Sequence, residues 1–331
     1  MRPLNFFYEE PNPDRFFPLD RYPRHFIRRL IRGKSMIRGQ KRVFLNLCAG
    51  LDLLGIPYQV NDYRYIQKHP EEVACIIGKP FVLDKLKWKN PILFGAAVFS
   101  HPCDDLHLFE RLPVSKILVP GEWMRKMFKP YYGDRAVNWA VGIDTAKWQP
   151  APLQHKHIDV LLYDKVLWEH DRHEKELIKP IRDHLARHHL TIKEIRYGFY
   201  KEEEFHTLLL QSKAMIFLCE HETQGIAYQQ ALSCGVPILA WDQGGFWKDP
   251  SYFPNKVKFA PVSSVPYWDD RCGIKFRDIN EFPARLEAFL DQLNHQRFAP
   301  RNYIIENLTL EKCAQRYVEI LNEVQHSLVQ L

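Results

Sequence analysis

The sequence predicts an α/β protein with parallel strands, arranged as two units of similar size. Short apolar runs alternate with stretches of helical periodicity along the 331 residues, which is typical of repeated strand–helix–strand units. Two prolines within residues 148–153 indicate a linker, after which the alternation restarts. A chain of this length fits about two domains. We therefore expect an amino-terminal Rossmann-like domain over residues 1–150, a second over 151–310 and a carboxy-terminal helix over 311–331.

In the first half, the clearest element is a helix over Phe44–Leu54, whose apolar residues recur at i, i+3, i+4 and i+7. Gly55 follows it, as expected of the residue after a helix end. Short apolar runs predict the next elements. We expect strands over 58–60, 73–77, 92–99 and 116–119, and a helix over about 122–128.

The second half repeats the alternation more regularly. Its predicted strands cover 158–163, 192–197, 215–219 and 236–241, and its predicted helices cover about 171–188 and 310–328. Ligands of open α/β sheets bind at the carboxyl ends of the strands. We therefore expect the site in a central cleft that the two domains face.

The composition excludes several classes of protein. Hydrophobic residues make up 46% and charged residues 26% of the chain, which argues against disorder. The seven cysteines include no Cys-x-x-Cys spacing, so neither a structural zinc site nor a disulfide framework is expected. The amino terminus lacks the apolar stretch of a signal peptide, and the longest apolar run falls far short of the roughly 20 residues that span a bilayer. These features predict a cytoplasmic protein.

The net charge of +6 is modest, but eight Lys or Arg residues gather in residues 24–42. Such a cluster suits an anionic membrane surface, phosphates or nucleic acid, and it is also typical of a solvated basic face. The cluster lacks interleaved aromatic residues and any recognisable nucleic-acid module. We therefore expect no nucleic-acid partner, and a peripheral membrane contact remains open.

The most informative segment is Cys219–Gly245, CEHETQGIAYQQALSCGVPILAWDQGG. A strand ends there in a polar loop, and Gly225 opens a helix that ends at Cys234-Gly235. The first amides of a helix and the helix dipole together suit a phosphate-type anion. Gln230 lies one turn after Ile226 and looks toward the same place. Taken singly, the loop acids Glu220 and Glu222 are also typical of solvated residues, and Gly225 of a plain turn.

The same segment resembles the donor-binding motif of retaining GT-B glycosyltransferases of the family 4, or group 1, type. That signature reads Glu, seven residues, Glu, and then A-x-A-x-G-x-P. Glu222 stands at the first acid, Gln230 at the second, and Ala231–Pro237 at the small-residue tail. The resemblance implies that Glu222 positions the donor sugar and that Gln230 holds the ribose hydroxyls, without the charge-assisted strength of a carboxylate. The donor-binding residues that it implies are Lys165, Tyr200, Thr223, Gln224, Gly225, Ile226 and Gln230.

Other patches are similar to the same family. Ile117–Lys126 with Val141–Thr145 looks like the end of its amino-terminal domain. Gly39 and Gln40 look like the glycine loop that faces the donor diphosphate or the acceptor. His101 follows a predicted strand and matches a catalytic histidine of the cleft. A histidine that caps local backbone, or His107 in its place, is the alternative.

The chain departs from the family at the diphosphate clamp. The family places an Arg after the first strand of the second domain and a Lys five residues later, where this chain has Lys165 and His170. Lys165 keeps a charge without the bidentate fork of Arg, and His170 is charged only when protonated. Arg172 is a candidate substitute. Tyr200 is expected beside the nucleotide base, with a packed aromatic as the alternative.

The resemblance implies a glycosyltransferase of the hexosyltransferase type that retains the anomeric configuration. Its donor would be a UDP- or GDP-sugar, and its acceptor a glycan, a lipid-linked or a small molecule. No Asp-x-Asp triplet occurs, and neither a metal nor another cofactor is expected. The alternative function is a catalytically weakened or inactive sugar-nucleotide-binding protein of the same fold.

Overall fold

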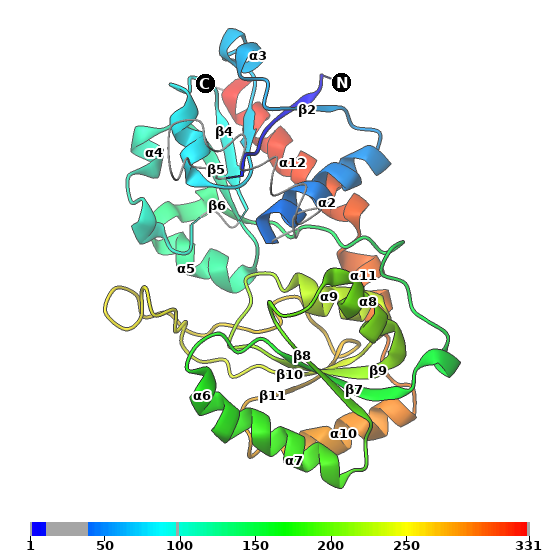
Figure 1. Cartoon of the computed structure of the whole chain (residues 1–331). Coiled ribbons are helices and arrows are strands. Elements are labelled where there is room, and N and C mark those ends of the chain that lie inside the picture. The colour runs from blue at the N-terminus through cyan, green and yellow to red at the C-terminus, as the bar shows by residue number, and fades with distance from the viewer. Residues whose placement is uncertain (1, 11–38, 97–98, 330–331) are drawn as a thin grey trace, which may run out of the picture. The chain divides into compact units, whose positions relative to one another are not determined.

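The computed structural model of the chain describes residues 2–10, 39–96 and 99–329 (Figure 1). These residues form two compact units, each built on its own parallel sheet. The first unit takes the described parts of Met1–Val119, Phe128–Trp139 and Ala314–Leu331. The second takes Pro120–Met127 and Ala140–Cys313. The prediction of an α/β protein with parallel strands is therefore confirmed.

The sheet of the first unit has six strands in the order β2-β1-β3-β4-β5-β6, and all neighbours run parallel. The strands are β1 (Leu4–Phe7), β2 (Tyr58–Val60), β3 (Ala74–Ile76), β4 (Ile92–Gly95), β5 (Val114–Val119) and β6 (Ala136–Asn138). The helices are α2 (Gly39–Leu53), α3 (Tyr63–Lys68), α4 (Leu108–Arg111), α5 (Glu122–Tyr132), which both units share, and α12 (Leu310–Val329), most of which lies in this unit. Short 3₁₀ turns cover Pro80–Lys85, Pro102–Asp104 and Gly133–Arg135.

Three strands of this sheet differ most from the prediction, because β1 and β6 were missed and β4 is shorter than expected. The sequence analysis missed β1, because its apolar run is short and contains Asn5; all four residues are nevertheless buried. Asn5 is tolerated there since it donates to Glu72 and accepts from Gln59. The predicted strand 92–99 already ends at Gly95, where φ is +121° and a Cβ would lie 2.4 Å from the Leu118 carbonyl oxygen.

The carboxy-terminal helix α12 returns to the first unit. Its Tyr317 ring is fully buried, with its centroid 5.8 Å from that of Phe6 and 5.2 Å from that of Trp139. An ion pair joins Lys116 of β5 to Glu323 of α12. The contacts therefore place most of α12 with the first unit and residues 140–150 with the second, whereas the sequence analysis expected boundaries after residues 150 and 310. Within the described residues, no helix combines the length and apolar composition that a bilayer crossing requires.

The sheet of the second unit has five parallel strands in the order β11-β10-β9-β7-β8. The strands are β7 (Ile158–Asp164), β8 (Ile192–Arg196), β9 (Ser212–Leu218), β10 (Ile238–Trp241) and β11 (Gly273–Phe276). The helices are α6 (His170–His173), the π-helical turn Glu174–Ile178, α7 (Lys179–Arg187), α8 (Glu202–Gln211), α9 (Ile226–Ser233), α10 (Phe282–Asn294) and α11 (Pro300–Asn307).

Side chains of the central strands alternate between two buried clusters, one on each face of this sheet. Met215 and Phe217 of β9 point into the cluster that α8, α9 and α11 cover. Ala214 and Ile216 point into the cluster that α7 and α10 cover. Figure 1 shows these helices on opposite sides of the sheet. Because both faces are covered, the open edge where the strands end is the place for polar residues to gather.

Candidate functional site

Strands β7 and β9 pair directly, with Asp164 opposite Leu218 at their carboxyl ends. Lys165 follows the first strand, and Glu222 lies in the loop after the second. The two side chains meet at this edge, where the Lys165 ammonium forms an ion pair with the Glu222 carboxylate. The side chains are only 14% and 10% exposed. Burial alone lowers the pKa of Lys165, but Glu222 offsets this and raises that pKa above its ordinary value, so the lysine is charged.

The loop that carries Glu222 comprises residues 219–225 and is anchored on several sides. The Glu222 backbone N–H donates to the Ser263 carbonyl at 2.9 Å, and its own carbonyl accepts from the Trp123 indole at 2.8 Å. Glu220 accepts from the backbone N–H groups of Leu167 and Trp168. Burial raises the pKa of Glu220, although these bonds oppose the rise. The two carboxylates therefore have fixed and different partners.

Gly225 precedes α9 and adopts a φ of +85°. A Cβ at this position would lie 2.0 Å from the Tyr228 ring, so the turn requires glycine. The Tyr228 hydroxyl is itself fixed, since it donates to the Tyr267 carbonyl and accepts from the Tyr267 N–H. The prediction that Gly225 opens a helix is confirmed, and the amides of its first turn lack acceptors within the helix.

Gln224 has surroundings that the sequence analysis did not foresee. Its side chain donates to the Val141 carbonyl at 2.7 Å and accepts from the Val141 N–H at 2.9 Å. It also donates to Gln229. Because both ends of its amide group hold other parts of the unit, we assign the side chain to supporting loop 219–225 rather than to a ligand.

Gln230 lies one helical turn after Ile226 and is 7% exposed. Within the described residues, no hydrogen bond joins its side chain to another group, so its amide is available at the helix face. Thr223 and Ile226 are partly buried. The Thr223 carbonyl packs so close to Gly121 that a Cβ there would approach within 2.4 Å.

The remaining residues predicted for the donor, Lys165, Tyr200 and His170 with its substitute Arg172, lie in the segments that follow β7 and β8. The Lys165 ammonium is 4.5 Å from the centroid of the Tyr197 ring. Tyr200 is partly buried, and its hydroxyl hydrogen-bonds to that of the buried Tyr163. His170 Nε2 lies 2.7 Å from Oδ2 of the buried Asp164. Arg172, the candidate substitute, pairs with carboxylates of its own helical segment, Glu169 and Glu176.

His101, Gly39 and Gln40 belong to the first unit. His101 is 2% exposed and caps the turn Pro102–Asp104, with Nδ1 accepting from the Cys103 N–H at 3.0 Å. Burial lowers the pKa of its imidazole, and Asp104 opposes this. This geometry is that of the capping alternative. His107 is exposed and pairs with Glu110. Gly39 and Gln40 form the first turn of α2, and residues 24–38 of the basic cluster lie outside the described residues.

The sequence analysis missed His221, which lies between Glu220 and Glu222. Its ring centroid is 5.0 Å from that of Trp168, 5.5 Å from Trp123 and 6.4 Å from Trp247. Both ring nitrogens are buried and have no hydrogen-bond partner among the described residues. Burial, with Lys165 adding to it, lowers the pKa of His221 to about 4. The only sequence signal was its place in the loop, because the three tryptophans are far apart along the chain.

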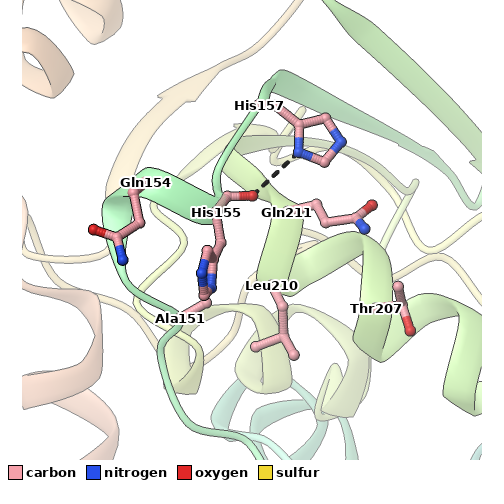
Figure 2. Close-up of a pocket in the computed structure, with 7 residues that line it drawn as sticks. All are labelled: Ala151, Gln154, His155, His157, Thr207, Leu210 and Gln211. Atoms are coloured by element: carbon pink, nitrogen blue, oxygen red, sulfur yellow. Dashed lines mark hydrogen bonds between the residues drawn. The ribbon is translucent and has the colours of Figure 1, made fainter.

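A hollow of about 490 Å³ lies elsewhere on the second unit (Figure 2). Its walls come from the segment before β7 and from the end of α8, just before β9. It therefore lies near the amino ends of these strands, away from Lys165 and Glu222. Its lining residues are Ala151, Gln154, His155, His157, Thr207, Leu210 and Gln211.

Neither a family model nor a curated protein sequence matches the chain. Solved structures do match it. Sucrose-phosphate synthase from Thermosynechococcus elongatus is similar over 99% of this chain and 100% of its own, at 9% identity and a TM-score of 0.59. The lipopolysaccharide outer core galactosyltransferase WaaB matches over 98% and 99%, at 11% identity and 0.56. HepE from Anabaena, in complex with UDP, matches over 98% and 100%, at 12% identity and 0.54.

Some matches are longer proteins. The chain spans 56% of the matched chain in the structure of accessory secretory proteins 1, 2 and 3 from Streptococcus pneumoniae, at 14% identity and a TM-score of 0.52. At these identities the likeness establishes the fold, which is the two-sheet GT-B fold of glycosyltransferases.

The buried imidazole of His221 predicts acid sensitivity. Its pKa is about 4 in the folded chain and near 6.5 when unfolded. Between these values the unfolded chain binds a proton that the folded chain does not. The free energy of unfolding is therefore unaffected by His221 above pH 6.5 and falls as the pH drops toward 4. We expect His221→Phe to remove about 3 kcal/mol of this loss. Urea unfolding of wild type and variant from pH 7 to pH 4 measures the difference.

The exposed His155, changed to Phe, is the matched control for that series. A wild type and a His221→Phe variant with parallel stability–pH curves would contradict the assignment.

Proposed function

We propose that this chain is a glycosyltransferase that moves a sugar from a nucleotide-sugar donor to an acceptor and retains the anomeric configuration. One observation carries the proposal: Lys165 and Glu222 meet at the carboxyl edge of the second sheet, in the loop that Gly225 closes before α9. A cation, a carboxylate and the first amides of a helix therefore all follow the carboxyl ends of the two neighbouring strands β7 and β9. The likeness to glycosyltransferase structures supports the same conclusion.

The proposed chemistry uses each group differently. When a sugar leaves a diphosphate, negative charge grows on the phosphate oxygens and positive charge on the anomeric carbon. Lys165 and the first amides of α9 would stabilise the phosphate charge. Glu222 would accept hydrogen bonds from hydroxyls of the donor sugar and orient it. Gln230 would bind the ribose. No metal enters this proposal, since protein groups supply the charge compensation.

The donor is proposed to be a UDP- or GDP-sugar, and the acceptor a glycan, a lipid-linked or a small molecule. A thermal-shift panel of UDP-, GDP-, ADP- and dTDP-sugars tests the donor, because a ligand that binds only the folded chain raises its melting temperature. Release of the sugar from the stabilising donor, measured without acceptor, then separates an enzyme from a binding protein. A panel without any stabilising member would contradict the proposal.

Glu222→Ala is predicted to abolish transfer. The variant removes the carboxylate that orients the sugar, and we expect at least a hundredfold loss in kcat, in the range found for groups that act at a reaction centre. Donor turnover is the measurement, with circular dichroism to establish that the fold persists, since the change also leaves Lys165 without its partner. Glu202→Ala, which breaks the exposed pair with Lys147, is the control. A folded Glu222→Ala enzyme with normal turnover would refute the role.

Gln230→Glu is predicted to tighten nucleotide binding or leave it unchanged. A carboxylate accepts from ribose hydroxyls more strongly than an amide does. Calorimetric titration with the donor found in the panel measures the effect. A large loss of affinity would show that the amide nitrogen of Gln230 donates to something that the carboxylate cannot serve.

A further inference from the structure

The two charged side chains on which the proposed function depends already bind each other. Lys165 Nζ donates to Glu222 Oε1, and both side chains are nearly buried. The other carboxylate of the loop, Glu220, is held by the backbone N–H groups of Leu167 and Trp168 instead. A ligand that binds the Lys165 ammonium therefore has to displace the Glu222 carboxylate.

Separating the pair has a cost that depends on the ligand. A buried ion that loses its charged partner is strongly destabilised, because water does not replace the lost interaction. A bare diphosphate compensates Lys165 and leaves Glu222 unpaired. A diphosphate that carries a sugar also brings hydroxyl groups, which donate to the freed carboxylate.

We propose that the Lys165–Glu222 ion pair makes the site select a complete nucleotide sugar over the free nucleoside diphosphate. This inference rests on the proposed function and assigns Glu222 a second role in it, as the group that competes with the diphosphate for Lys165. The competition also favours product release. Once the sugar has left, re-formation of the ion pair displaces the remaining nucleoside diphosphate.

The anchoring of both residues makes such a competition possible without movement of the main chain. The Lys165 backbone N–H donates to the Leu218 carbonyl at 2.8 Å, and Glu222 is held through Ser263 and Trp123. Only side-chain torsions have to change. The Tyr197 ring lies 4.5 Å from the ammonium and gives the lysine a second favourable contact while it changes partner.

The test is calorimetric titration of UDP, UDP-glucose, GDP and GDP-mannose into the full chain. For the nucleotide that binds, uridine or guanosine, wild type is expected to bind the nucleotide sugar more tightly than the free diphosphate. Glu222→Gln keeps the shape of the side chain and frees Lys165, so it is expected to bind the diphosphate about tenfold more tightly. The same variant is expected to lose the preference for the sugar form.

Glu202→Gln is the matched control, because it removes a carboxylate from a lysine on the exposed surface of the same unit and changes the net charge equally. It is expected to bind both ligands like wild type. Lys165→Gln and the double variant Lys165→Gln/Glu222→Gln are expected to bind the diphosphate weakly and equally, because Glu222 acts through the lysine.

The outcomes separate this inference from the proposed function. If wild type binds a diphosphate and folded Glu222→Gln binds it equally or more weakly, the competition is refuted and the transferase proposal stands. If wild type and Glu222→Gln bind none of the four ligands, the competition and the proposal of a UDP- or GDP-sugar donor both fail. Glu222→Asp, which keeps the charge on a shorter side chain, decides the matter if Glu222→Gln does not fold. Diphosphate binding tighter than wild type supports the competition, and unchanged binding refutes it.

Discussion

A single buried ion pair sets the constraints on this site. Two charges that leave water are tolerated only when each supplies the other with a partner at close range. Lys165 and Glu222 satisfy this condition because β7 and β9 are direct neighbours and end at the same level. Another strand order in the second sheet would place the two residues apart. The parallel pairing is thus what turns two residues distant in sequence into one electrostatic unit.

The loop around Glu222 is rigid through contacts that come from remote parts of the second unit. Its main chain is bonded to Ser263 and Trp123, and Gln224 fixes it to Val141. Its last residue, Gly225, packs against the Tyr228 ring only because glycine has no Cβ. Pre-formed loops of this kind spend little conformational entropy on binding, which suits a group that has to orient a sugar.

The sequence was sufficient for the features that local pattern encodes. Continuous apolar runs predicted the buried strands of the second sheet, and Gly225 predicted the start of its helix by residue type. The strands β1, β6 and β11 were missed; each has at most four residues, and each includes a polar residue within its short run. What no local pattern encodes is the pairing of residues across long separations. The partner of Lys165, the use of Gln224 to hold Val141, and the three indole rings around His221 depend on how the strands are ordered.

The pairing of residues across the sheet also determines how anions can bind at the carboxyl ends of β7 and β9. The chain has an excess of positive charge, yet each cationic candidate near the carboxyl ends of β7 and β9 already faces a carboxylate. Lys165 faces Glu222, His170 faces Asp164, and Arg172 faces Glu169. Within the part of the chain that the structure describes, no carboxylate accepts a hydrogen bond from the first amides of α9, so these amides keep their positive potential. An anion that binds one of these cations therefore has to displace a carboxylate, and the group that then replaces the cation at that carboxylate decides which ligand stays. Glu222 is the carboxylate that the proposed function places against the donor sugar, so at Glu222 a sugar hydroxyl would replace the lost cation.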